Sequence, residues 1–193
     1  MRSVCVYCGS SPGRDPAYAE AARALGRALA ARGLGLVYGG ASVGIMGVVA
    51  DTVLALGGRV TGVIPEALAR KEVAHGELTE LLVVSSMHER KTRMADLADA
   101  FVALPGGVGT LEEIFEAWTW AQLGLHGKPC GFLNAAGYWD GLIAFLDHAV
   151  AERFVKEPHR AMLVVSDDPG ELLDRFAAYR APAVTKWIRK GEA

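Results

Sequence analysis

The residues best suited to chemistry lie in one glycine-rich segment, PGGVGTLEE at residues 105–113. An apolar run at residues 100–104 precedes this segment, and a helical pattern over residues 111–123 follows it. Free N–H groups at the start of a helix bind anions, and glycine lets the backbone approach a phosphate closely. The segment therefore predicts a phosphate site. The carboxylates beside it, Glu112 and Glu113, indicate that the ligand is also acted upon.

Glu113 has a purely structural explanation as well. If Thr110 is the N-cap of the helix, Thr110 and Glu113 form a capping box, in which each side chain accepts a hydrogen bond from the other residue's backbone N–H. Acidic residues also suit the positive end of a helix dipole. On spacing alone, this structural role explains the acidic pair more simply than catalysis does.

Arg90 gives a second chemical signal, in a helix predicted over residues 87–98. At about 100° per residue, Arg90 lies on the same stripe as the apolar residues Met87 and Met94. An unpaired guanidinium is costly to bury, so Arg90 needs an anionic partner. A substrate phosphate and a carboxylate near Glu113 are the candidates. A salt bridge that serves only the fold, or a side chain that reaches water, fits the spacing equally well.

The elements that must position these residues alternate regularly along the chain. Expected strands cover residues 4–8, 35–38, 59–64, 81–85, 100–104, 129–133 and 162–165. Expected helices cover residues 16–32, 45–56, 87–98, 111–123, 138–153 and 169–179. Short, continuously apolar strands are typical of a parallel sheet covered on both faces. The pattern predicts one α/β domain over residues 1–193, a doubly wound, Rossmann-like parallel sheet of about seven strands with helices on both faces.

Ligands of such sheets bind at the carboxyl ends of the strands. Three glycine- or serine-rich turns follow strands, at residues 9–11, 39–42 and 106–109, and we expect them to meet on one rim. None of them has the G-x-G-x-x-G fingerprint of dinucleotide sites, and the chain has no Gly-Lys-Ser/Thr of a P-loop. The fold thus indicates a nucleotide, but not NAD or ATP bound in the usual ways.

Composition excludes several other classes of function. The net charge of −2 gives no general attraction to nucleic acid or to acidic membranes. No apolar run approaches the ~18 residues that a membrane span requires. The first seven residues enter a strand pattern directly and are too short for a signal peptide. We therefore expect a cytoplasmic protein that contacts neither membranes nor nucleic acid.

Neither the cysteines nor the histidines suggest a metal centre. The three cysteines, Cys5, Cys8 and Cys130, are an odd number, and Cys5 lies within the first expected strand, so we expect buried free thiols. The five histidines are scattered, without His/Cys pairs at zinc spacing. We expect no metal site.

Taken together, the segments resemble the LOG (Lonely Guy) family, the cytokinin riboside 5′-monophosphate phosphoribohydrolases, older members of which were labelled lysine decarboxylases. The likeness rests on PGGVGTLEE at residues 105–113 and MHERK at residues 87–91. It extends over nearly the whole chain, with YCGSS at 7–11, YGG at 38–40, GIMG at 44–47 and WAQLG at 120–124. One departure is Ala41, where the family usually has a third glycine.

The resemblance implies an enzyme without a cofactor. It would hydrolyse the N-glycosidic bond of an N6-substituted AMP, or of AMP itself, to the free base and ribose 5-phosphate. Arg90 and Glu113 match the catalytic pair. The residues expected to bind substrate are Glu72, Met87, Lys91, Gly106, Gly107, Val108, Gly109, Thr110 and Thr119, together with Gly9, Ser10 and Gly40 on the neighbouring turns. A homodimer is implied as well.

The chemistry leaves some roles open. N-glycoside cleavage passes through an oxocarbenium-like state. Glu113 would stabilise this cation, orient the ribose hydroxyls or activate water. Arg90 would keep Glu113 ionised or position the leaving base, and Glu72 would contact the base or the ribose.

Three alternatives remain at this point. A nucleotide carrier or sensor would share the fold and the phosphate loop but release no ribose 5-phosphate. A general AMP nucleosidase would differ only in its preference for the base. A pyridoxal-phosphate lysine decarboxylase requires a Schiff-base lysine. The lysine in the motifs is Lys91, and it directly follows Arg90, which the hydrolase interpretation assigns to the catalytic pair.

Overall fold

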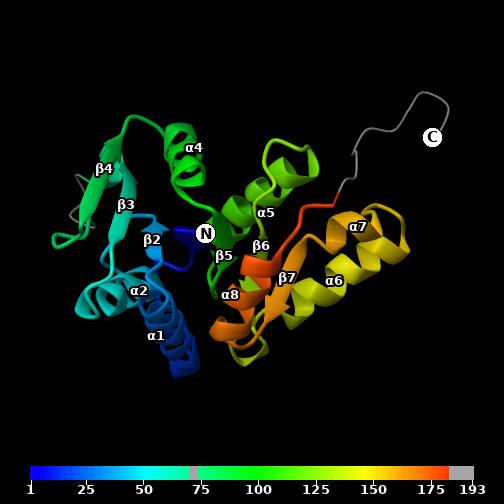
Figure 1. The fold of residues 1–193 in the computed structure, drawn as a ribbon, viewed down its shortest axis with the longest axis horizontal. Helices are drawn as coiled ribbons and strands as arrows, with labels where there is room; N and C mark the ends of the chain where they lie inside the picture. Colours follow the sequence, from blue (N-terminus) through cyan, green and yellow to red (C-terminus); the bar gives the residue numbers. More distant parts are fainter. Residues whose placement is uncertain (70–73, 183–193) are drawn as a thin grey trace.

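The computed structural model describes residues 1–69 and 74–182. Seven parallel strands form one sheet in the order β4-β3-β2-β1-β5-β6-β7 (Figure 1). The strands are β1 (Ser3–Tyr7), β2 (Gly35–Tyr38), β3 (Val60–Pro65), β4 (Glu80–Val84), β5 (Ala100–Ala103), β6 (Cys130–Leu133) and β7 (Leu163–Ser166). The predicted α/β class, the parallel sheet and the helices on both faces are confirmed.

Helices cover both faces of this sheet. The long helices are α1 (Pro16–Ala31), α2 (Gly44–Ala55), α4 (Met87–Leu97), α5 (Val108–Gln122), α6 (Asp140–Ala151) and α8 (Pro169–Ala178). Short ones are α3 (Glu66–Leu68), the 3₁₀ turn η2 (Ala135–Gly137) and α7 (Glu157–Arg160). In Figure 1, α1 and α2 lie on one side of the sheet and α4 and α5 on the other.

Alternation along the strands divides the core between the two faces. In β1, Val4 and Val6 pack in the cluster that contains α1, α2 and α8. Cys5 and Tyr7 pack in the cluster that contains α4, α5 and α6. Because successive side chains of a strand point to opposite faces, a strand in a doubly covered sheet must be apolar throughout. This requirement explains why the strands were recognisable as short apolar runs.

The strand order reverses at β1, and this point indicates where a ligand would bind. β1 pairs with β2 on one side and with β5 on the other, and the last pair of the second ladder is Tyr7 with Ala103. Beyond this pair, Gly9 N–H donates to the carbonyl of Pro105 at 3.0 Å. Ligands of open α/β sheets bind at such a switch point, outside the carboxyl ends of the strands.

Most expected boundaries differ from the observed ones by one or two residues, but α5 begins three residues earlier than expected. α5 begins at Val108 and not at 111, because Gly107 is extended and the backbone turns helical directly after it. The helix expected over 138–153 is shorter, since Trp139 is the N-cap of α6. Before it, η2 contains Ala136 with a φ of 49°. α3 and α7 were not predicted because they are too short for a periodic pattern.

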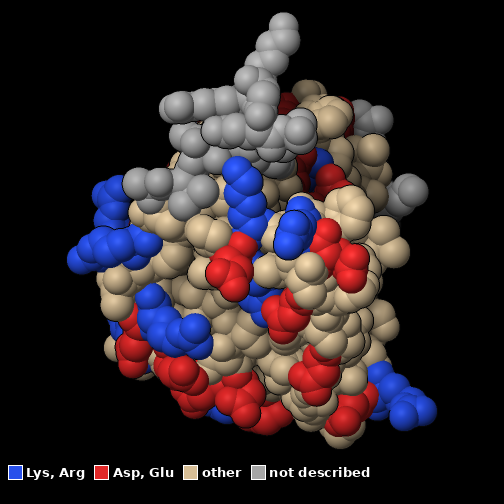
Figure 2. Space-filling model, turned by 90° about the vertical axis from the view of Figure 1, so that its right-hand side faces the viewer, with Lys and Arg blue, Asp and Glu red and all other residues tan. Residues whose placement is uncertain are grey.

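Two surface properties bear on the expected partners. No helix within residues 1–69 and 74–182 is long and apolar enough to cross a membrane. On the face at the right-hand side of Figure 1, where α6 and α7 lie, acidic and basic side chains are interspersed (Figure 2).

Candidate active site

The first turn of α5 corrects the capping-box prediction. Gly107 is the N-cap, without a side-chain hydrogen bond, and Thr110 is the third helical residue. The first intrahelical bond runs from Leu111 N–H to the carbonyl of Gly107, at 3.1 Å. The N–H groups of the preceding residues point out of the helix end, where an anion would be stabilised by them and by the helix dipole. Thr110 and Glu113 therefore form no capping box, and the prediction of that motif is wrong.

Glu113 instead forms a buried ion pair with Arg90. Arg90 Nη1 lies 3.0 Å from Glu113 Oε1, and the two side chains are only 12% and 10% exposed. The charged partner that the apolar stripe of α4 required is thus Glu113 itself. Replacing one member of such a pair leaves an uncompensated buried charge, so burial makes the two residues depend on each other.

Two backbone features hold the Arg90 guanidinium in place. Arg90 Nε donates to the carbonyl of Val63 in β3 at 3.1 Å. At the end of β2, Gly39 leaves the space that the guanidinium occupies, since an added Cβ there would overlap Arg90 Nη2. Arg90 of α4 therefore reaches Glu113 of α5 through a space that exists because residue 39 is glycine.

Burial and the charge of Arg90 have opposite effects on the pKa of Glu113. Burial raises its pKa above the ordinary glutamate value, while the charge of Arg90 opposes this effect. Tyr7, the last residue of β1, and Cys8, which follows it, have pKa values raised by burial. They are therefore neutral near pH 7, and Arg90 is the charged group that directly contacts the carboxylate. A carboxyl with a raised pKa in a cleft is suited to acid–base chemistry.

A cavity of about 450 Å³ lies in front of this pair. Eight of the residues expected at the site line it: Gly9, Ser10, Arg90, Gly107, Val108, Gly109, Thr110 and Glu113. The turns after β1, β2 and β5 all contribute to the lining, as expected for a common rim.

Part of the lining was not anticipated. The apolar side is formed by Ala41, Val43, Met46, Ile64 and Leu68. Ile64 lies in β3, and the other four follow β2 or β3 in the chain or lie near the start of α2. The signal in the sequence for a role at the cavity was their proximity to the glycine turn at residues 39–42. Apolar residues at such positions are, however, usually interpreted as part of the hydrophobic core.

Other expected residues lie outside the lining. Lys91 is buried and binds Glu112 and Glu116 on α5, with Nζ 2.6 Å from Glu112 Oε1 and 3.0 Å from Glu116 Oε2. Thr119 lies six residues beyond Glu113, about 9 Å further along α5. Glu72 lies outside the described residues.

Three further residues support the cavity from nearby. Met87 contacts Arg90, with Sδ 3.2 Å from Nη1. The carbonyl of Gly40 accepts a hydrogen bond from His75 N–H at 2.9 Å. The carbonyl of Gly106 accepts one from Tyr138 Oη at 2.5 Å.

The three cysteines are buried free thiols, as expected. Burial raises the pKa of each one. Cys8 lines the cavity, but a thiol with a raised pKa supplies little thiolate and is a poor nucleophile.

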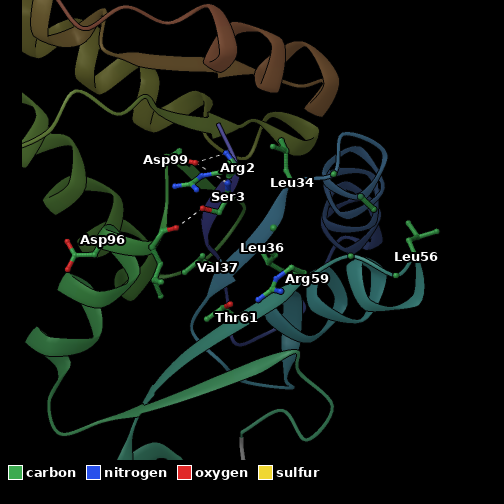
Figure 3. A pocket seen from close by; sticks show the side chains of 16 residues that line it. Arg2, Ser3, Leu34, Leu36, Val37, Leu56, Arg59, Thr61, Asp96 and Asp99 are labelled. Atoms are coloured by element: carbon green, nitrogen blue, oxygen red, sulfur yellow. Dashed lines mark hydrogen bonds between the residues drawn. The ribbon is translucent and has the colours of Figure 1, made fainter.

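A second cavity, of about 500 Å³, lies at the amino ends of β1, β2 and β3, whereas the first cavity lies at the carboxyl ends of the strands (Figure 3). Its polar groups serve the fold. Asp99 accepts hydrogen bonds from the N–H groups of Arg2 and Ser3, and Ser3 Oγ donates to the carbonyl of Leu97. This cavity is remote from the Arg90–Glu113 pair.

Fold and site together define a doubly wound α/β protein in which the uncapped amino end of α5 and the buried Glu113 line one cavity at the switch point. A family model described as "Possible lysine decarboxylase" matches residues 46–176. A cytokinin riboside 5′-monophosphate phosphoribohydrolase of Rhodococcoides fascians is 50% identical over 182 residues, covering 94% of this chain and 90% of that protein. Its counterpart named LOG, from Oryza sativa subsp. japonica, is 49% identical over 179 residues, covering 93% and 74%. The chain therefore belongs to the LOG family of cytokinin riboside 5′-monophosphate phosphoribohydrolases.

Solved structures with the same fold are more distant in sequence. A molybdenum cofactor binding protein from Rippkaea orientalis superposes with a TM-score of 0.70 at 19% identity, covering 92% of this chain and 96% of that one. A Moco carrier protein from Chlamydomonas reinhardtii gives a TM-score of 0.68 at 19% identity. At this level of identity the likeness concerns the fold alone.

Proposed function

We propose that this protein hydrolyses the bond between the purine and the ribose of cytokinin riboside 5′-monophosphates, or of AMP. Water adds to C1′ of the ribose as the glycosidic bond breaks, the base leaves with the bonding electrons and acquires a proton, and ribose 5-phosphate is the second product. The observation that carries this proposal is the buried Arg90–Glu113 pair, which shares one cavity with the uncapped end of α5. The names of the family's members describe the same activity.

The amino end of α5 is the proposed phosphate site. Gly107, Val108 and Gly109 are exposed at the cavity. Their N–H groups come before that of Leu111, which donates the first hydrogen bond within the helix. Thr110, although buried, also lines the cavity. A 5′-phosphate bound at this helix end would face N–H donors and the positive end of the dipole.

The position of Glu113 suits the ribose. It follows the proposed phosphate-binding residues by about one turn of α5 and lines the same cavity, so a ribose attached to a phosphate bound there would come close to its carboxylate. An ionised Glu113 would stabilise the oxocarbenium-like transition state electrostatically and accept a proton from the attacking water. Arg90 would hold Glu113 in the ionised state and in one orientation.

The apolar side of the cavity is the proposed site of the base. Val43, Met46 and Leu68 line the same cavity as Glu113 and are contributed by the segments after β2 and β3. A purine with an apolar N6 substituent would bury carbon against these side chains, which contributes about 25 cal/mol per Å² of apolar surface removed from water.

A homodimer is the proposed assembly. Val83, Met87 and Val108 are large apolar residues that are 55%, 43% and 83% exposed. Met87 contacts the guanidinium of Arg90, and Val108 lines the same cavity as Arg90. Association of two copies would cover such residues. The cytoplasmic location stays a prediction from the sequence.

Product analysis tests the proposed function. The purified protein is incubated separately with isopentenyladenosine 5′-monophosphate, with AMP and with the unphosphorylated riboside, and free base and ribose 5-phosphate are quantified. We expect equal amounts of both products from at least one nucleotide and no cleavage of the riboside. Nucleotide binding without either product would support a carrier or sensor and refute the hydrolase. Equal cleavage of riboside and nucleotide would refute the phosphate site.

A further inference from the structure

Tyr138 is a polar side chain beside the proposed phosphate site that the proposed catalytic arrangement does not use. It lies in the turn after β6, the strand next to β5, and its hydroxyl donates a hydrogen bond of 2.5 Å to the carbonyl of Gly106. Tyr138 lines a small cavity of about 300 Å³ and is absent from the lining of the substrate cavity. The tyrosine therefore contacts the glycine segment from outside the substrate cavity.

Hydrogen bonds fix three consecutive carbonyl groups of the glycine segment, those of residues 105–107. The first accepts from Gly9 N–H at 3.0 Å, and the third accepts from Leu111 N–H at 3.1 Å. The middle one, the carbonyl of Gly106, accepts from the hydroxyl of Tyr138. Because this middle bond comes from a side chain, a substitution can remove it and leave the two backbone bonds in place.

The bond from Tyr138 also sets the direction of an N–H group. The carbonyl of Gly106 and the N–H of Gly107 belong to one planar peptide group, which is trans, so they point in opposite directions. Gly107 N–H therefore points away from Tyr138. Of the two cavities, Gly107 lines both, whereas Tyr138 lines the smaller one. Rotation of this peptide plane would change the direction of one of the donors proposed to bind phosphate.

The peptide needs this restraint because it joins two glycines, which accept backbone angles that other residues avoid. No atom of the described residues lies within 4 Å of the place that a Cβ on Gly107 would take, so packing does not hold that side of the peptide. The ring of Tyr138, in contrast, packs edge-on against the rings of Tyr18 and Trp139, with centroids 5.3 and 4.7 Å away. A well-packed side chain thus holds a flexible peptide.

The turn that presents Tyr138 has an uncommon backbone. Ala136 has a φ of 49° and Gly137 a φ of 71°, both in the left-handed region. The side chain of Asn134 closes the turn, since its Oδ1 accepts from Trp139 N–H at 2.8 Å. A residue other than glycine is costly in the left-handed region and persists where its surroundings hold it. Such a turn fits a specific placement of the tyrosine that follows it.

We propose that Tyr138 is a positioning residue, whose hydroxyl holds the Gly106–Gly107 peptide so that Gly107 N–H is directed at the 5′-phosphate of the nucleotide. This role rests on the proposed function, because it concerns the phosphate site of that reaction. The peptide then needs no reorientation when the phosphate binds, which is the advantage of preorganised donors. Tyr138 itself does not touch the substrate.

The test compares two ligands that represent the two halves of the nucleotide. Tyr138→Phe removes the hydroxyl and keeps the aromatic ring, and calorimetry measures the binding of ribose 5-phosphate and of adenine. We expect Kd for ribose 5-phosphate to rise about tenfold, the effect of about one lost hydrogen bond, and Kd for adenine to stay within about twofold. Tyr18→Phe is the matched control, because it removes a hydroxyl from the neighbouring ring and leaves the bond from Tyr138 to Gly106. Both Kd values should stay within about twofold in this control.

Two outcomes of these titrations would overturn the proposed role. Unchanged binding of ribose 5-phosphate by Tyr138→Phe would show that the hydroxyl contributes nothing to the phosphate site. Equal weakening of both ligands would assign Tyr138 to the general structure of the protein. Because Tyr138 is 41% exposed and the ring is retained, the variant should fold, with Tm lowered by less than about 4 °C.

Amide relaxation separates positioning from direct contact with the phosphate. The ¹⁵N relaxation of Gly107 is measured in the wild type and in Tyr138→Phe, both without ligand. Positioning predicts a lower order parameter or exchange broadening of the Gly107 amide in the variant. Identical relaxation together with weaker binding of ribose 5-phosphate would mean that the hydroxyl touches the phosphate, and the proposed role would be wrong.

Neither measurement depends on cleavage, so the proposed role and the proposed function can fail separately. If no nucleotide is cleaved, the hydrolase is refuted, but a selective loss of ribose 5-phosphate binding in Tyr138→Phe still supports the role of Tyr138. If nucleotides are cleaved and Tyr138→Phe binds ribose 5-phosphate as tightly as the wild type, the role is refuted and the hydrolase stands. A wild type that binds no ribose 5-phosphate would refute both the phosphate site and the role of Tyr138.

Discussion

Replacing Gly39 by alanine should disable the site with little effect on stability. An added Cβ would overlap Arg90 Nη2, and the guanidinium would have to retreat by about 1 Å to reach the ordinary contact distance of about 3.5 Å. At an effective dielectric constant of about 20, the attraction between charges 3.0 Å apart is about 5.5 kcal/mol, and at about 4 Å it is about 4.2 kcal/mol. The retreat thus weakens the Arg90–Glu113 pair by about 1.4 kcal/mol.

Other effects of Gly39→Ala partly offset this loss in the free energy of unfolding. Gly39 is not among the glycines with positive φ, so alanine fits its backbone and restricts the unfolded chain, a gain of about 0.4–1 kcal/mol. The net destabilisation should stay below about 1 kcal/mol, which lowers Tm by less than about 4 °C in a chain of this size. Activity should fall about 100-fold, because a misplacement of about 1 Å at a catalytic group has that effect.

Gly35→Ala, at the first residue of the strand that Gly39 follows, is the matched control. A Cβ on Gly35 would meet its nearest neighbours at 3.8 Å, which is an ordinary contact. The assay measures kcat for base release from isopentenyladenosine 5′-monophosphate, together with Tm by calorimetry. Wild-type activity in Gly39→Ala, or an equal loss in Gly35→Ala, would refute the reasoning that Gly39 makes room for Arg90.

Three further results are expected. Val108→Asp, at the first turn of α5, should stabilise the helix by about 0.3–1 kcal/mol but raise KM for the nucleotide, and an unchanged KM would argue against a phosphate there. Because the pKa of Glu113 is raised, the protonated group stabilises the fold. In guanidinium unfolding, the stability of the wild type relative to Glu113→Gln should be greatest below the ordinary glutamate pKa and fall as the pH rises through the raised value; a rising difference would contradict this sign. The thiols of Cys5, Cys8 and Cys130 should resist alkylation at pH 8 until the protein is unfolded, and rapid labelling of the native state would show that they are not buried.

The fold could be predicted well because its determinants are local or periodic. A strand such as β5 is apolar at every position, since both faces of the sheet are covered. Chain order then fixes the parallel arrangement, because crossovers of this kind are nearly always right-handed. The meeting of the three turns on one rim follows from the same rule and needs no side-chain detail.

The geometry of the site could be predicted only in part. The apolar stripe of α4 showed that Arg90 needs an anion, but the choice of Glu113 depends on the packing of α4 beside α5. The start of α5 was misplaced because Gly109 reads as part of a turn, whereas the first turn of a helix tolerates it. The function of Gly39 could not be read at all, since its importance lies in the space left for a side chain 51 positions further along.

The central claim is that the buried carboxylate of Glu113 acts in the reaction and does not merely hold the fold together. Glu113→Gln keeps the size of the side chain and an oxygen that accepts from Arg90, so the nucleotide should still bind. Binding of isopentenyladenosine 5′-monophosphate is measured by calorimetry, and base release is measured in a single turnover. We expect a Kd within about threefold of the wild type and a rate of base release reduced by about 10²–10⁴-fold. Base release at the wild-type rate from a correctly folded Glu113→Gln protein would contradict the account.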